Sequence, residues 1–339
     1  LFTLLAIGTL VTTFGVGMAD TVWPTPPWYL LFHERAGDFG WYVEHAHRIA
    51  GYVVGFLVLA LVAAHWQFSP SRRTRGLAWL GILAVVLGTA LGMVQVRQAT
   101  SKSIDALANP GFGMALGGAM ALAVAVVAEL FSRAAGRWQR TWASLAFLGI
   151  VVQGLLGGLR VYLNELRGPE LAITHGVFAQ VVTAMVCLLA MTTSSRWNQW
   201  ADLDHERVVR WISVLLVSLL LVQIIFGGLL RHIDATWGKR LHPMLALIAL
   251  GLAGVLVLRT TSGEGGSGLR GKARALFLMM LVQAVLGVEA LVRVTDAASA
   301  YRGATAWDAA WRSIHVWMGF GVFAAAAMFA ARAWKGKLL

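Results

Sequence analysis

Apolar runs of about twenty residues recur along the whole chain and are separated by short polar segments. A helix of about 20 apolar residues crosses a hydrocarbon core of roughly 30 Å and satisfies its own backbone hydrogen bonds there. The pattern therefore predicts an all-α fold, a polytopic membrane bundle of about ten transmembrane helices. The predicted spans are 1–19, 46–67, 77–97, 111–131, 142–163, 172–193, 209–230, 241–259, 273–293 and 312–331.

The composition agrees with a membrane protein and leaves no room for a separate soluble domain. Of 339 residues, 58% are hydrophobic and only 13% are charged, which is more apolar surface than a soluble protein can cover. Residues 20–44 are long enough only for a small cap. Because Leu1 already lies in an apolar stretch, we expect a first true span there and not a cleaved signal peptide. The one cysteine, Cys187, lies within a span, so neither a disulfide nor a thiolate metal site is expected.

The distribution of basic residues predicts the orientation. The loops after the second, fourth, sixth and eighth spans, together with the C-terminal tail, hold sixteen of the 28 Lys and Arg residues. Positively charged loops stay on the cytoplasmic side, so both termini are predicted to be cytoplasmic. This topology and anionic membrane lipids account for the net charge of +12. The charge therefore gives no support to nucleic-acid binding.

Four of the nine histidines share one depth in the predicted bundle. His47, His175, His242 and His315 each fall within about the first turn of an even-numbered span, at the predicted outer face. Ionisable side chains inside a membrane are rare and usually functional, and neutral imidazole is a common axial ligand of heme iron. At two histidines per heme, the sequence predicts two hemes towards the outer face.

Small residues lie one helical turn below each of these histidines. A flat porphyrin needs small residues where it lies against a helix, while the alternative reading is that small residues let membrane helices pack closely. The same arrangement on four helices favours heme. The residues are Gly51, Ala179, Ala246 and Gly319.

A weak internal repeat precedes three of the histidines. Val-Gln-Gly-Leu-Leu-Gly-Gly at 152–158, Val-Gln-Ile-Ile-Phe-Gly-Gly at 222–228 and Val-Gln-Ala-Val-Leu-Gly at 282–287 each place a Gln one turn before a Gly. This spacing predicts close helix contact and an interhelical hydrogen bond, and the chain reads as two related halves. In span 77–97 Leu87 replaces the Gln of the repeat, and span 111–131 has no histidine, so residues 77–131 are predicted to be an extra helical pair that binds no heme.

The cluster Glu44-His45-Ala46-His47-Arg48 is the most informative short segment. On a helix Glu44 lies on the same face as His47 and Arg48, whereas His45 points elsewhere and is expected to be solvated. A carboxylate beside an iron ligand is more than electron transfer requires, and oxidative chemistry uses such a group for proton transfer. The alternative is a Glu44–Arg48 ion pair at the membrane surface.

Four arginines lie near the predicted outer edge and are candidates to pair with heme propionates, because a guanidinium offers a planar fork for carboxylates. Surface anchoring explains any one of them equally well. They are Arg48, Arg160, Arg231 and Arg240.

Taken together, these motifs resemble heme A synthase. The resemblance rests on Glu-x-x-His-Arg at 44–48, on the Gln-Gly-Leu-Leu-Gly-Gly segment that leads to Thr174-His175-Gly176, on the Arg231-His232 pair and on the late histidines, and it covers most of the chain. It implies two four-helix halves, which are residues 1–200, with the extra pair 77–131, and residues 201–339.

The resemblance also implies a reaction and a site. His47 and His175 would embrace the substrate heme in the first half, and His242 and His315 would hold heme b in the second. The C8 methyl of heme O would be oxidised to a formyl group by successive hydroxylations, giving heme A for cytochrome oxidase, with Glu44 as the essential acidic residue.

The implied partners are heme O, a heme O synthase upstream and an electron donor of unknown identity, in a bacterial inner membrane. The oligomeric state is left open. Two features depart from the family: ten spans are predicted against its usual eight, and the outer-loop cysteine pair of some members is missing. A bis-histidine cytochrome b that only passes electrons, and a transporter or assembly factor without a cofactor, are the alternatives.

Overall fold

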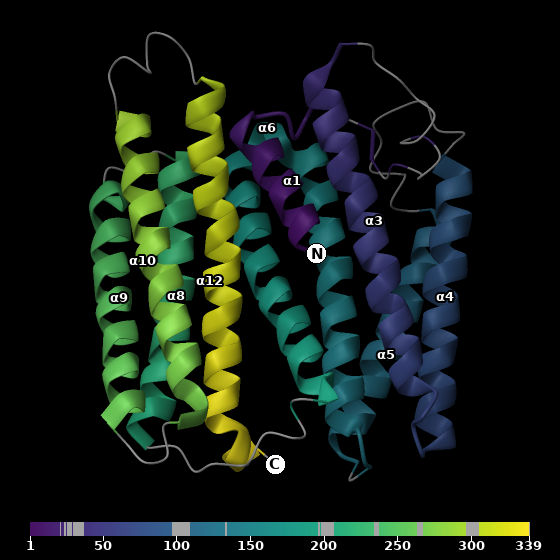
Figure 1. Cartoon of the computed structure of the whole chain (residues 1–339). Helices are drawn as coiled ribbons and strands as arrows, with labels where there is room; N and C mark the ends of the chain where they lie inside the picture. The colour runs from purple at the N-terminus through teal and green to yellow at the C-terminus, as the bar shows by residue number, and fades with distance from the viewer. Residues whose placement is uncertain are drawn as a thin grey trace. The chain divides into compact units, whose positions relative to one another are not determined.

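The computed structural model describes residues 1–20, 22–23, 25, 29, 37–96, 109–132, 134–195, 197, 207–233, 237–262, 267–295 and 305–338. Over these residues the chain is helical and has no strand, which confirms the predicted all-α class (Figure 1). The helices are α1 (Phe2–Thr13), α3 (Phe39–Trp66), α4 (Arg72–Val96), α5 (Pro110–Leu130), α6 (Arg137–Thr193), α8 (Arg207–Ile233), α9 (Gly238–Ser262), α10 (Ser267–Thr295) and α12 (Ala306–Leu338).

Eight of these helices are long and apolar enough to cross a membrane. They contain nine of the ten predicted spans, because the 57-residue α6 includes two of them. Its two helical segments meet at Arg167, where φ is −144° and ψ is 30°, two residues before Pro169. Proline has no N–H to donate and disfavours helical backbone before it, which explains why the helix breaks there.

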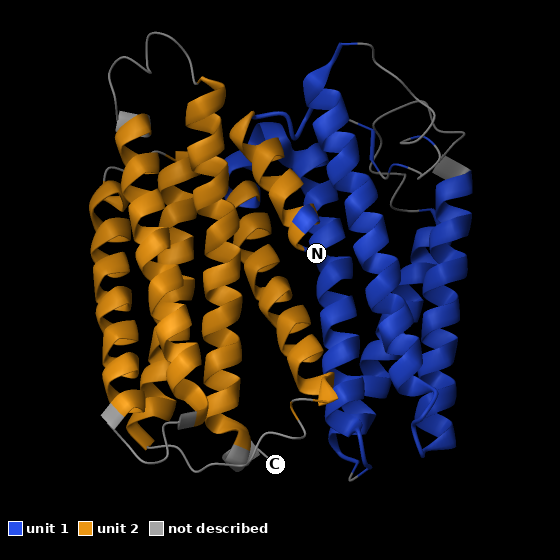
Figure 2. Cartoon of the chain, in the orientation of Figure 1, with its two compact units in different colours: residues 1, 3, 15–171 blue, residues 2, 4–14, 172–339 orange. Residues whose placement is uncertain are grey.

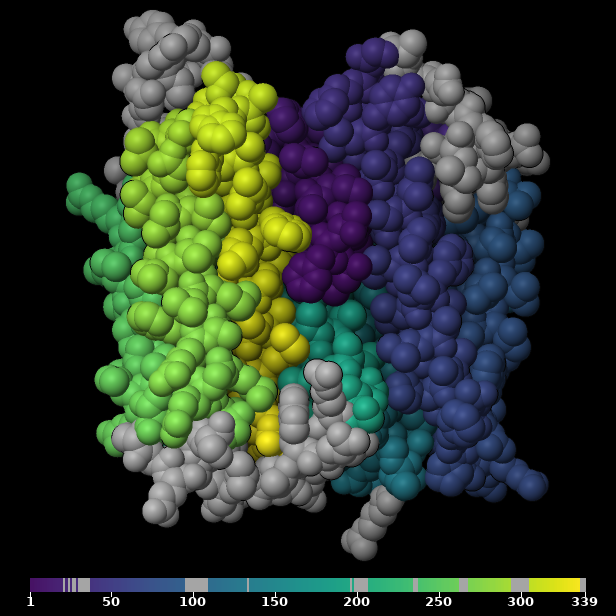
Figure 3. Space-filling view, viewed as in Figure 1, coloured from purple at the N-terminus to yellow at the C-terminus, as the bar shows by residue number. Residues whose placement is uncertain are grey.

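The first predicted span, 1–19, is represented by α1, which is only 12 residues long. Gly15 has a φ of 67°, and this left-handed conformation ends the helix. Twelve residues are fewer than the roughly 20 that cross a bilayer. Helix α1 lies beside α12 (Figures 1 and 3), where Trp317 Nε1 donates a hydrogen bond to the Phe2 carbonyl at 3.0 Å.

The chain divides into two compact units (Figure 2). Unit 1 comprises residues 1, 3 and 15–171, and unit 2 comprises residues 2, 4–14 and 172–339. The two units divide after Leu171, four residues beyond the break in α6, and most of α1 belongs to unit 2. His47 is therefore in unit 1, whereas the other three predicted ligands are in unit 2. The assignment of one heme to each half of the chain stays a prediction.

Unit 2 is built around α8, α9, α10 and α12. Each of these helices packs on the next, and α12 packs back on α8, so α9 and α12 lie diagonally across the bundle. The buried side chains of α8 end at Leu220, and the buried apolar side chains of α9 begin at Ala249. The apolar core, which includes Leu216, Leu256 and Phe323, therefore fills one half of the bundle. The other half, which contains His242 and His315, holds mostly half-buried residues.

The predicted extra pair corresponds to α4 and α5, which form a tightly packed helical hairpin in unit 1. A Cβ at Gly118 would lie 2.6 Å from the carbonyl oxygen of Gly81, and a Cβ at Gly81 would lie 2.7 Å from that of Gly118. Gly88 and Gly111 meet in the same way two turns further along. Glycine is required at these positions because the two backbones touch. Since α4 packs mainly on α5 and only lightly on α3, the hairpin is held together largely by its own contacts.

We expect Gly118→Ala to destabilise the protein by about 1–3 kcal/mol, the usual cost of overpacking a closely fitted contact. Gly117→Ala is the matched control, because a Cβ at this neighbouring glycine meets nothing within 4 Å. The measurement is the unfolding midpoint of the purified protein in detergent. Equal midpoints for the two variants would contradict the close backbone contact.

Candidate functional site

Two of the predicted iron ligands, His242 and His315, face each other inside unit 2. They come from the diagonal helices α9 and α12. Their ring centroids are 6.3 Å apart, and the ring planes are nearly perpendicular at 87°. The structure thus brings together two histidines that are 73 residues apart in the sequence.

The separation of these rings can be compared with what a shared metal requires. An imidazole nitrogen binds a first-row transition metal at about 2 Å. The centre of a five-membered ring with bonds of about 1.3 Å lies about 1.1 Å from each ring atom. Two imidazoles on opposite sides of one iron therefore have centroids about 6 Å apart. The distance between His242 and His315 matches this value.

A glycine of a neighbouring helix lies against each ring. A Cβ at Gly227 of α8 would lie 2.9 Å from Cε1 of His242, and a Cβ at Gly287 of α10 would lie 2.9 Å from Cε1 of His315. The same atom of each ring is approached at the same distance, because both glycines belong to the predicted Gln-x-x-x-Gly repeat. The repeat is therefore a packing motif that leaves space for an imidazole.

The glutamines of the repeat hold the same two histidines. Nδ1 of His242 lies 2.9 Å from the Gln223 carbonyl oxygen, which can only accept, so Nδ1 carries the proton and Nε2 has its lone pair free. Gln283 Nε2 donates to the backbone carbonyl of His315 at 3.0 Å. The interhelical hydrogen bond predicted from the repeat is confirmed for Gln283, whereas Gln223 bonds through its backbone. These residues fit a heme held by two imidazoles.

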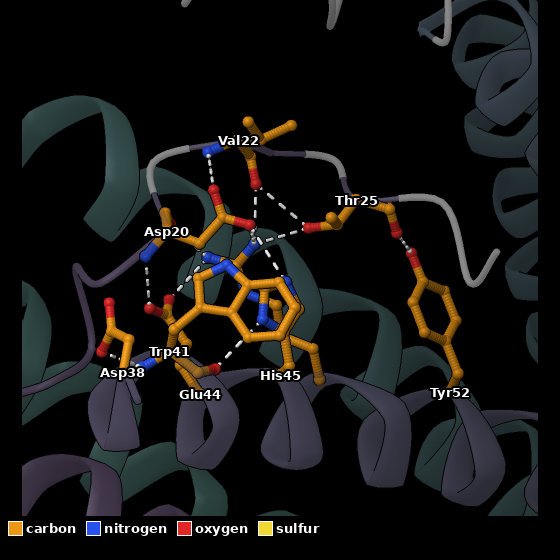
Figure 4. Close-up of polar contacts among 9 residues, drawn as sticks. Asp20, Val22, Thr25, Asp38, Trp41, Glu44, His45 and Tyr52 are labelled. Carbon is orange, nitrogen blue, oxygen red and sulfur yellow. Dashed lines mark hydrogen bonds and ion pairs between the residues drawn. The ribbon is translucent and has the colours of Figure 1, made fainter. Parts of the chain in front are cut away.

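In unit 1 the Glu44 cluster packs under a short segment that we call the strap, whose described residues are Asp20, Val22, Trp23 and Thr25 (Figure 4). Arg48 donates from Nη1 to the Val22 carbonyl at 2.6 Å and to Thr25 Oγ1 at 2.5 Å. It donates from Nη2 to the Asp20 carbonyl at 2.6 Å and to Glu44 Oε1 at 2.5 Å. All four terminal N–H groups of Arg48 are thus directed to protein oxygens. A heme propionate would have to replace one of these partners, so the role of Arg48 in cofactor binding stays a prediction.

The rest of the strap is also held by hydrogen bonds to helices of unit 1. Tyr52 Oη donates to the Thr25 carbonyl at 2.7 Å, and Tyr162 Oη donates to the Trp23 carbonyl at 2.6 Å. The Trp23 indole rests directly on Gly158 of α6, where a side chain would collide with it. The residues 20–25 that are described therefore link α3 to the first segment of α6.

Glu44 is 4% exposed, and both of its carboxylate oxygens are engaged. Oε1 pairs with Arg48, and Oε2 accepts from the Asp20 backbone N–H at 2.8 Å. The ion pair considered from the sequence is therefore present, but it is buried under the strap and not at a solvated surface. This arrangement gives Glu44 a clear structural role beside the proposed catalytic one.

His45 was expected to be solvated, and this prediction is wrong. The side chain is 2% exposed, and its Nδ1 lies 3.0 Å from the Trp41 carbonyl. Its Nε2 lies 3.1 Å from Oδ2 of Asp20, which is also buried. The sequence analysis missed Asp20 because the helical spacing of residues 44–48 says nothing about a partner 24 residues before Glu44.

The remaining predicted residues are placed individually. His47 on α3 and His175 on α6 are both half-buried, and their pairing stays a prediction because they lie in different units. A Cβ at Gly51, one turn below His47, meets nothing within 4 Å, and the use of this space by a porphyrin stays a prediction. Two further histidines of the sequence, His33 and His205, lie outside the described residues. The described residues contain no group of three or more His, Cys, Asp or Glu side chains that could hold a metal ion by themselves.

Comparison of the chain with family models, with curated proteins and with solved structures found no match.

Proposed function

We propose that this chain is a di-heme membrane oxidoreductase of the heme A synthase type, which oxidises the C8 methyl of heme O to a formyl group. The observation that carries heme binding is the His242–His315 pair, whose ring centroids are 6.3 Å apart. Gly227 and Gly287 leave room for the rings, the Gln223 carbonyl orients the His242 ring, and Gln283 holds the His315 backbone. A bound heme would supply an iron centre for electron transfer and oxidation.

The residues of this chain have separate roles in the proposal. His242 and His315 hold heme b in unit 2. His47 and His175 hold the substrate heme. Glu44 lies on the same helical face as His47 and moves a proton during oxidation of the methyl group. The proposed reaction rests on the sequence resemblance, and the histidine geometry supports heme binding.

A bis-histidine cytochrome b that only passes electrons is the second candidate, and one observation favours it. Both carboxylate oxygens of Glu44 are occupied, by Arg48 and by the Asp20 backbone N–H. A carboxylate that only fixes the strap is not available for proton transfer. The two candidates therefore differ in whether Glu44 exchanges these partners during turnover.

The test is extraction of the hemes from protein purified out of cells that make heme O, followed by chromatography and mass spectrometry. We expect wild type to contain heme b together with heme O or heme A. In Glu44→Gln, heme A and its hydroxylated precursor should fall by about a hundredfold, the usual contribution of a positioned proton-transfer group, while heme b is retained.

Glu165→Gln is the matched control, because Glu165 is an exposed carboxylate of α6 in the same unit. It should leave all heme species unchanged. Heme b alone in wild type and in both variants would contradict the synthase proposal and leave the cytochrome. A colourless protein would contradict both candidates.

A further inference from the structure

Within the described residues of unit 2, two arginines on neighbouring helices have no carboxylate partner. Arg231 lies in the last turns of α8, and Arg312 lies in the second turn of α12. Among the described residues neither forms an ion pair, and the one hydrogen bond of the Arg231 guanidinium runs from Nη2 to Thr13 Oγ1 at 2.7 Å. By contrast, Arg293 of α10 pairs with both Glu289 and Asp308.

Arg231 and the residue next to Arg312 contact the same hydroxyl of α1. Thr13 Oγ1 accepts from Arg231, and it also lies 2.8 Å from Oγ of Ser313, the residue that follows Arg312. Arg312, a second cation, is therefore close enough to Arg231 for the two positive charges to repel each other. Two cations near each other without a counter-ion are unfavourable in a medium of low dielectric constant. An anion between them would remove this repulsion.

Both arginines lie one helical turn from the histidine pair, towards the same end of the bundle. Arg231 is four residues after Gly227, which contacts His242, and Arg312 is three residues before His315. Because α8 and α12 run in opposite directions in this unit (Figure 1), both steps lead towards the same end, by about 5 Å each. A ligand that reaches the histidines can therefore place an acidic group between the arginines.

We propose that Arg231 and Arg312, together with Thr13, form a site for an oxyanion carried by a membrane-embedded amphiphile. The two sources with this chemistry are the carboxylates of a porphyrin held by His242 and His315 and the phosphate of an anionic lipid. A guanidinium binds either oxyanion through two parallel hydrogen bonds. The porphyrin source rests on the proposed function, whereas the lipid source does not.

The experiment uses the purified full-length chain in detergent. Wild type, the double variant Arg231→Gln/Arg312→Gln and the control Arg259→Gln are titrated with iron protoporphyrin IX and with its dimethyl ester, which lacks the two acidic groups. Arg259 is an exposed arginine in the last turn of α9, in the same unit. In parallel, native mass spectrometry measures how much added phosphatidylglycerol and phosphatidylcholine each protein retains.

With a porphyrin as the source, wild type and Arg259→Gln bind the diacid at least tenfold more tightly than the ester, and the double variant loses this preference. With a lipid as the source, wild type binds the diacid and the ester equally well but retains more phosphatidylglycerol than phosphatidylcholine. The double variant retains the two lipids equally. Equal porphyrin binding and equal lipid retention in wild type and double variant would overturn the site. Failure of the proposed function is distinguishable from failure of the arginine site. If the proposed function fails, wild type binds neither the diacid nor the ester, and the lipid measurement still tests the arginines.

Discussion

Gly227→Ala and Gly287→Ala should each remove most of the heme b, lowering its ratio to protein by about tenfold. The added methyl group would lie 2.9 Å from Cε1 of His242 or of His315, so the imidazole must move. Metal ligation tolerates displacements of only about 0.2 Å. The measurement is heme content together with the low-spin absorption spectrum of the purified protein, because a heme that loses one histidine changes its spin state.

Gly251→Ala is the control for this prediction. Gly251 lies on α9, the helix that carries His242, and a Cβ there meets nothing within 4 Å. Its heme content should equal that of wild type. An equal loss in all three variants would show that any added methyl group disturbs the bundle. Full heme content in Gly227→Ala would contradict His242 as a ligand.

Glu44→Ala should lower the free energy of unfolding by about 3–5 kcal/mol, the usual cost of leaving one partner of a buried ion pair alone. The Arg48 side chain is 13% exposed and would keep its charge without a carboxylate, and the Asp20 N–H would lose its acceptor. Glu165→Ala, at an exposed position, should change stability by no more than about 0.5 kcal/mol. The measurement is denaturant unfolding in detergent, followed by tryptophan fluorescence.

This expectation affects how a loss of activity in Glu44→Ala is interpreted. A variant that loses both product and stability does not separate proton transfer from strap anchoring. Glu44→Gln keeps an oxygen acceptor for Arg48 and similar volume, so product loss at near-wild-type stability would identify a chemical role. An unfolding free energy of Glu44→Ala equal to that of wild type would contradict the buried ion pair.

The helices were predictable where hydrophobicity alone determines them. Predicted spans 209–230, 241–259 and 273–293 lie within α8, α9 and α10, whose ends extend beyond them by several polar residues. The start of α3 was missed by seven residues, because Phe39–His45 contains polar groups that a hydropathy pattern counts as loop. The helix starts there because Asp38 Oδ1 caps it, accepting from the Trp41 N–H at 2.9 Å.

The candidate site was predictable only where its residues follow helical spacing. The Gln-x-x-x-Gly repeat showed that Gly227 and Gly287 lie at equivalent positions, and the structure places both against histidines. Asp20 has no such periodic relation to Glu44, and its position depends on how the strap folds back over α3. The convergence of Arg231 on Thr13 likewise depends on tertiary packing and leaves no local pattern in the sequence.

The position of α1 beside α12 has a consequence for biosynthesis. The hydroxyl oxygens of Thr13 and Ser313 lie 2.8 Å apart, although the two residues are 300 positions apart in the sequence. A ribosome adds about 5–20 residues per second, so the chain between them takes about 15–60 seconds to make. Helix α1 therefore docks after translation of α12, and contacts of such long sequence separation form slowly. Assembly of this end of unit 2 is a late step, and it depends on both ends of the described chain being present together.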